Sequence, residues 1–175
     1  MNRRPRLTTT LATTLAAASL LACGKGDDGP QHWSKRATET VTATVGGVAF
    51  SIDVPQGMRQ KTEDDEVAFD YHLGDRVYTP DITIRVASKP HTLAAYLETE
   101  SAKDFLRKEE VPGGFVTSAE NPYYKGKEDY LVHVEKTAGD KALTCDARVT
   151  RWSQGDKVKD NVPKLEAVCL SLTAK

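Results

Sequence analysis

The stretch TVTATVGGVAFSIDV, Thr40–Val54, decides the fold. Apolar residues occupy every second position on both sides of Gly46-Gly47, namely Val41, Ala43, Val45, Val48, Phe50, Ile52 and Val54. An alternation of this kind is typical of a strand that buries one face. Two adjacent glycines supply the positive φ angles that a two-residue hairpin loop needs. The stretch therefore predicts an antiparallel β-hairpin.

The same alternation returns in later segments, which predicts an antiparallel sheet of about seven to eight strands. The segments are residues 66–73, 81–87, 114–120, 128–137, 142–152 and 164–174. One region has helical spacing instead, with Thr92 as a candidate N-cap and Pro112 as a stop. Its apolar residues are Leu93, Tyr96, Leu97, Phe105 and Leu106. We expect an α+β fold in which one main helix, at about residues 92–110, packs on the sheet.

The cysteines are Cys23, Cys145 and Cys169. A polar loop centred near Lys157 lies midway between Cys145 and Cys169, so a hairpin around it would place these two residues opposite each other. In an oxidising compartment the pair would form a cross-strand disulfide. The alternative is two free, buried thiols. Neither cysteine lies in a C-x-x-C pair, which argues against a redox or zinc site.

The leader combines a basic start, MNRRPR, with a weakly apolar run over residues 7–22. This run is too short and too polar to span a bilayer, and it is typical of an export signal. The residues LLAC, ending at Cys23, resemble the lipobox of bacterial lipoproteins. The resemblance implies that residues 1–22 are a signal peptide and that Cys23 carries lipid. A secretory signal with a coincidental cysteine is the alternative, and Arg3-Arg4 leaves twin-arginine export open.

Residues 23–38 are polar and rich in glycine, and we interpret them as a flexible tether ahead of a single domain at residues 39–175. Trp33 interrupts this segment, and we expect it to pack on the domain rather than lie at the lipid interface. In the enterobacterial lipoproteins that the leader resembles, aspartate after the cysteine favours retention at the inner membrane, and Gly24 stands there instead. The leader therefore predicts a lipid-anchored protein of the cell envelope, and the resemblance implies the outer membrane if the host has two membranes.

The net charge argues against nucleic acid as a partner. Residues 1–22 hold three of the 24 Lys and Arg residues and no acid, so the rest of the chain has a formal charge of −4. Binding to phosphates needs clustered Lys and Arg, which this sequence lacks. The sequence also lacks a catalytic serine motif and a phosphate-binding loop. We expect no cofactor, no metal and no catalytic residue.

Two sets of residues are candidates for a site. Tyr123, Tyr124, Tyr130 and Trp152 could form a patch that contacts an envelope protein or a glycan, because aromatic residues suit such surfaces. The alternative is that these rings cover the sheet. Asp70 and His72 share one face of a strand beside the acidic run Glu63–Glu66. They are the candidate for a metal or acid–base site, although an acidic run before a strand is usually a solvated turn. His133 and His91 show the pattern of solvent-facing or cap-related histidines.

The segment GVAFSIDVPQGM, residues 47–58, resembles the opening of the PsbP-like α/β sandwich family. The order of the later elements is similar too, with an extended strand at residues 81–87, a helix, and paired strands through residues 130–152. This resemblance implies a non-enzymatic binding or assembly role and transfers no catalytic residue. We therefore expect a lipid-anchored envelope lipoprotein with a binding or accessory domain. The alternatives are a structural lipoprotein without a partner and an envelope hydrolase or metal-dependent enzyme.

Overall fold

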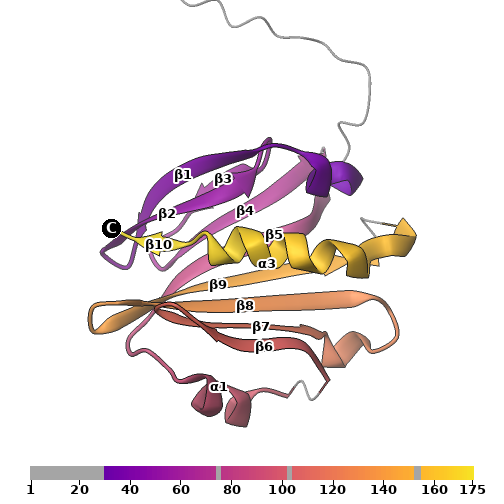
Figure 1. Ribbon diagram of the computed structural model, residues 1–175. Coiled ribbons are helices and arrows are strands. Elements are labelled where there is room, and N and C mark those ends of the chain that lie inside the picture. The colour runs from indigo at the N-terminus through magenta and orange to yellow at the C-terminus, as the bar shows by residue number, and fades with distance from the viewer. Residues whose placement is uncertain (1–29, 74–75, 102–103, 152–154) are drawn as a thin grey trace, which may run out of the picture.

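The computed structural model describes residues 30–73, 76–101, 104–151 and 155–175. Antiparallel strands form two sheets, with the orders β3-β4-β5-β9-β8-β7-β6 and β1-β2-β10 (Figure 1). The large sheet contains β3 (Arg59–Thr62), β4 (Glu66–Leu73), β5 (Arg76–Ala87), β6 (Phe105–Val111), β7 (Gly114–Glu120), β8 (Asp129–Ala138) and β9 (Lys141–Thr150). The small sheet contains β1 (Thr38–Val45), β2 (Val48–Pro55) and β10 (Thr173–Ala174). The helices are α1 (Leu93–Thr99) and α3 (Val162–Leu170), with 3-10 turns η1 (Pro30–Lys35), η2 (Pro122–Tyr124) and η3 (Gly155–Asn161).

The expected hairpin is confirmed as β1 and β2. Val45 pairs with Val48, and the loop residues Gly46 and Gly47 have φ angles of +53° and +79°. Both values lie in the left-handed region that glycine adopts without strain. The antiparallel α+β architecture is confirmed as well.

The core lies between the two sheets, with α3 running along the large sheet (Figure 1). One face of the large sheet supplies Val67, Phe69, Ile82, Ile84, Val134 and Cys145, and β2 supplies Phe50 and Ile52. Trp33, in η1, is fully buried in this core, so the expectation that it packs on the domain is confirmed. The segment that we interpret as a tether, residues 23–38, therefore includes a residue of the core.

The expected helix at 92–110 is wrong beyond its first two turns. Thr92 does cap α1, since its Oγ1 accepts a hydrogen bond from the Ala95 N–H at 3.2 Å, but the helix ends at Thr99. Residues Phe105–Val111 form β6 instead, which pairs with β7 along the edge of the large sheet. Pro112-Gly113 is the loop of this hairpin, with Gly113 at φ +76°, and not a helix stop. Pairing with β7 outweighs the helical spacing of Phe105 and Leu106.

The expected strand at 164–174 is also wrong, because most of it is α3. The buried residues Val162, Leu165, Val168, Cys169 and Leu172 recur at helical spacing and face the sheet. Only Thr173–Ala174 is extended, and it pairs with β2. The disulfide between Cys145 and Cys169 is confirmed, with a Cα–Cα distance of 5.5 Å. It joins β9 to α3, so it is not a cross-strand bridge.

A buried carboxylate helps to hold α3 in place. Glu166 of α3 accepts a hydrogen bond from the Ser118 hydroxyl of β7 at 2.6 Å. Its second oxygen accepts one from the Arg107 guanidinium of β6 at 3.0 Å. Because both oxygens of this nearly buried group are satisfied, its burial is tolerated, and α3 is fixed to strands at the far side of the sheet from β5.

Candidate functional site

The second face of the large sheet, opposite α3, carries polar side chains and a cavity. Cys145 of β9 faces α3, and because side chains alternate along a strand, its neighbour Asp146 points to the other face. His133 of β8 pairs with Asp146 and so lies on that same face. Helix α1 covers part of this face and borders an open cavity of about 350 Å³. The lining residues are Asp81, Thr83, Tyr96, Glu100, Phe105, Thr117, Ala119, Leu131, Val132, His133, Asp146, Ala147 and Arg148.

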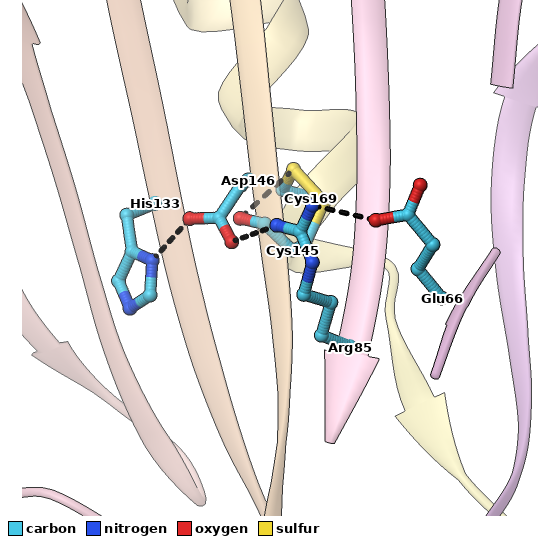
Figure 2. Close-up of polar contacts among 6 residues, drawn as sticks. All are labelled: Glu66, Arg85, His133, Cys145, Asp146 and Cys169. Carbon is cyan, nitrogen blue, oxygen red and sulfur yellow. Dashed lines mark hydrogen bonds and ion pairs between the residues drawn. A yellow bond between two sulfur atoms is a disulfide. The ribbon is translucent and has the colours of Figure 1, made fainter. Parts of the chain in front are cut away.

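A row of alternating charges crosses this face from β4 to β8 (Figure 2). Arg85 of β5 lies 2.6 Å from Glu66 of β4 and 3.6 Å from Asp146 of β9. The other oxygen of Asp146 lies 2.7 Å from Nδ1 of His133 on β8. A carboxylate only accepts hydrogen bonds, so we assign the proton of His133 to Nδ1. Asp146 is thus held from two sides.

Aromatic rings attach α1 to the same face. Tyr96 stacks on the His133 ring with a centroid distance of 4.4 Å and an interplanar angle of 9°, and Phe115 lies 5.1 Å from Tyr96. Burial raises the pKa of the Tyr96 hydroxyl far above its usual range. Nε2 of His133 is buried and has no hydrogen-bond partner among the described residues. The His133–Asp146 pair therefore supports α1 rather than presenting a free base, and His133 is not the solvent-facing residue that its position suggests.

A second contact fixes the segment before α1. Glu135 of β8 is 2% exposed, and its two oxygens accept hydrogen bonds from the backbone N–H of His91 and from Nδ1 of His91 at 2.9 Å. His91 directly precedes the N-cap Thr92. The expectation of a cap-related histidine is thus confirmed for His91, and the start of α1 is held against β8.

Asp81 is the most perturbed acid of the cavity. Burial raises the pKa of its carboxyl to about 6, against the opposing effect of Arg148, while Asp129 and Asp70 add to the rise. Arg148 is the register partner of Asp81 on β9, but its guanidinium binds Asp129 of β8 instead, through Nε at 3.1 Å and through Nη2. No hydrogen bond from a described residue reaches the Asp81 carboxyl. Asp81 is therefore a half-buried acid whose carboxyl receives no hydrogen bond from a described residue.

The cavity as a whole is acidic. Its lining holds the carboxyl groups of Asp81, Glu100 and Asp146 against a single guanidinium, that of Arg148. Asp129, which is 3% exposed, already neutralises that guanidinium. A ligand for this site would need positive charge, because the carboxyl groups of the lining outnumber its one guanidinium.

The structure separates the predicted tyrosine patch. Tyr123 is 83% exposed and Tyr124 is 44% exposed, both in η2. The Arg148 guanidinium lies 5.4 Å from the centre of the Tyr124 ring, so η2 borders the cavity. Tyr130 is buried in the core beneath the opposite face and does not belong to the surface. Trp152 lies outside the described residues. A contact patch at Tyr123 and Tyr124 stays a prediction.

The acidic candidates around β4 are engaged in separate ion pairs. Asp70 lies 3.5 Å from Arg59, and Glu63 lies 2.5 Å from Lys61, whose hydrogen bond lowers the pKa of Glu63. The side chain of His72 lies outside the described residues. No three metal-ligating side chains converge anywhere in the part of the chain that the structure describes. Asp70 and Glu63 thus each lie beside a cation, and a joint site of Asp70 with His72 is not tested by the described residues.

Cys23 and the leader also lie outside the described residues. Within residues 30–73, 76–101, 104–151 and 155–175, no helix has the length and apolar character needed to cross a bilayer. The lipid anchor therefore stays a prediction of the sequence.

No known protein family and no curated protein matches this chain. Among solved structures, the solution structure of cyanobacterial PsbP (CyanoP) from a Synechocystis species is 11% identical, with a TM-score of 0.47, and the match covers 89% of this chain and 99% of that one. A crystal structure from Bacteroides thetaiotaomicron is 15% identical over 72% of this chain, with a TM-score of 0.40, and this chain spans 45% of that protein. The resemblance to PsbP is thus a distant likeness of fold. What the site does has to be argued from its own geometry.

Proposed function

We propose that this protein is a lipid-anchored lipoprotein of the cell envelope whose domain binds a small cationic ligand in the cavity beneath α1. The observation that carries the proposal is the Asp81 carboxyl, which lines the cavity, is half-buried and receives no hydrogen bond from a described residue. A half-buried acid with a raised pKa in a cavity is a typical feature of a functional site. An ammonium group would supply the missing donors and the missing charge.

The dimensions and the remaining lining fit this ligand class. A cavity of about 350 Å³ lies within the range of small-molecule sites. Phe105, Leu131 and Tyr96 offer apolar contact to the body of a ligand, while Glu100 adds negative charge and Asp146 is shared with Arg85. His133 is stacked beneath Tyr96 and its Nε2 is buried, so the site offers no accessible base beside the acids. We therefore propose binding rather than catalysis.

Binding of matched probes tests the proposal. We expect 1,4-diaminobutane to bind saturably and to shift the amide resonances of residues lining the cavity in NMR spectra, whereas succinate, which has a similar length and the opposite charge, should not. Asp81→Asn should weaken the binding of diaminobutane at least about tenfold, the equivalent of ~1.4 kcal/mol. Glu98→Gln removes an exposed carboxylate of α1 that does not line the cavity, and it should leave the affinity unchanged. Equal binding by wild type and Asp81→Asn would contradict the proposal.

The raised pKa of Asp81 also predicts a dependence of stability on pH. Keeping the Asp81 carboxylate ionised in the folded protein costs free energy. This cost is absent below pH 4, near the pKa of the group in the unfolded chain, and it is complete above pH 6, near its pKa in the folded protein. At pH 7.5 the free energy of unfolding of Asp81→Asn should therefore exceed that of wild type by about 1–3 kcal/mol, and the variant should melt at a higher temperature. The difference should vanish at pH 4. A thermal melt at each pH measures both values, and a gain that is independent of pH would show that ionisation is not its cause.

The lipid anchor has its own test. We expect Cys23→Ser to move the protein from the membrane fraction of its host to the soluble fraction, because acyl chains on Cys23 are the proposed attachment. Thr13→Ser alters the same leader and keeps Cys23, so it should leave the protein in the membrane fraction. Fractionation followed by immunoblotting reports both. Retention of Cys23→Ser at the membrane would refute the anchor.

A further inference from the structure

Strand β1 forms an open edge of the small sheet. The strand order is β1-β2-β10, so β1 pairs on one side only, with β2. Figure 1 shows β1 along the outside of the molecule, at the opposite end from α1. An open strand edge presents unpaired backbone N–H and C=O groups, which are a template for another strand.

The register identifies which residues present these groups. Val45 and Val48 flank the two-residue loop and form a hydrogen-bonded pair, so the odd-numbered residues of β1 bond to β2. On the far side of β2 the pattern is consistent, since the Ala49 C=O accepts from the Lys175 N–H and the Asp53 N–H donates to the Ser171 hydroxyl. The even-numbered residues therefore direct their backbone groups outward, and they are Thr38, Thr40, Thr42 and Thr44. No backbone hydrogen bond from a described residue reaches these four.

The edge strands β3 and β6 carry several charged residues, whereas β1 carries one, Glu39 near its start. Edge β3 carries Arg59 and Lys61, and edge β6 has the run RKEE at residues 107–110. Charged side chains on an edge hinder the approach of another strand. The outward positions of β1 are all threonine, a β-branched residue with a high preference for strands and no charge. The four threonines are exposed.

We propose that β1 is a strand-addition site whose occupant is β1 of a second copy of this chain, paired antiparallel about a two-fold axis. Such a pairing sets outward residues against outward residues, so that Thr40 lies opposite Thr42 of the second copy. Thr–Thr pairs across strands are favourable. In this register Glu39 meets Ala43 and the half-buried Val41 meets its own equivalent, so no like charges oppose each other. The edge is therefore complementary to itself, and two small sheets join into one.

Sedimentation and amide hydrogen exchange of the full chain test the proposal. We expect the apparent mass to double with rising protein concentration, and the N–H groups of Thr40, Thr42 and Thr44 to gain protection over the same range. Thr42→Lys places a charge at the edge of each copy and should keep the chain monomeric at ten times the concentration that half-dimerises wild type. Thr137→Lys makes the same change at an exposed residue of the interior strand β8 and should dimerise as wild type does.

Three outcomes would overturn the proposal. Protection of the threonine N–H groups in a chain of monomer mass would mean that another segment of the same chain covers the edge. Dimerisation of Thr42→Lys equal to that of wild type would place the contact elsewhere on the surface. A monomer at every concentration, with unprotected threonines, would mean that the edge stays open. None of these outcomes depends on whether the cavity binds a cation, so the two proposals fail independently.

Discussion

Removal of the Cys145–Cys169 disulfide is expected to lower the free energy of unfolding by about 3.5 kcal/mol. Closing a loop with a sequence separation of 24 residues restricts the unfolded chain by roughly this amount on the chain-entropy account. Both cysteines are fully buried, and the bridge fastens α3, which covers the core, to the central strand β9. Once the bond is absent, α3 is held by packing and by Glu166.

Chemical unfolding of the Cys145→Ala/Cys169→Ala variant measures this loss. Wild type under reducing conditions is the matched control, since it lacks the bond but keeps both sulfur atoms, and its midpoint should approach that of the variant. A reducing agent should have no effect on the variant. A loss below about 1 kcal/mol would mean that packing alone fixes α3 and that the bridge adds little.

Trp33→Ala is expected to cost about 3–5 kcal/mol, the usual range for truncating a large aromatic residue in a core. Trp33 is fully buried, although it precedes the first strand and lies in a short 3-10 turn. Its indole Nε1 has no hydrogen-bond partner among the described residues, so packing alone accounts for its contribution. This result would show that residues ahead of β1 belong to the folded unit.

Trp33→Phe separates packing from polarity. Phenylalanine keeps most of the apolar volume and removes the unpartnered N–H, so this variant should lose much less stability than Trp33→Ala. Arg36 supplies a comparison close by, because its guanidinium rests on the Tyr71 ring at 5.0 Å near the surface. Arg36→Ala should cost under about 1 kcal/mol. If Trp33→Ala proved as mild as Arg36→Ala, the turn would contribute nothing to the core.

Local pattern is sufficient for those parts of the fold whose stability is local. The β1–β2 hairpin is readable because alternation and a Gly-Gly loop agree with each other. Residues 164–174 carry both periods at once, since Leu165, Ala167 and Cys169 alternate while Leu165, Val168 and Leu172 follow a helix. Whether the segment forms a strand or a helix depends on the sheet surface against which its apolar residues are buried, and residues distant in the sequence form that surface. The pairing of Cys145 with Cys169 is correct, although the hairpin that suggested it does not exist.

The candidate site is harder to read, because its residues occupy positions that a strand normally gives to solvent. Asp81 and Asp146 lie in strands where polar side chains alternate with buried ones. They become neighbours of a cavity because the sheet places β9 between β5 and β8. Helix α1 then covers that face through Tyr96 and His133. The only local signal was the lone His133, flanked by Val132 and Val134, and that signal does not name its partners.

The late position of α3 and β10 in the chain has a consequence for the order of folding. The first hairpin forms locally, but its sheet and its core are complete only after residues 162–174 have joined. Contacts between such distant parts of a chain form slowly, because a long loop must close before they are made. While these residues are still missing, β2 lacks its second neighbour and the large sheet lacks its cover. The native fold is therefore expected to be complete only once residues 162–174 are available to the rest of the chain.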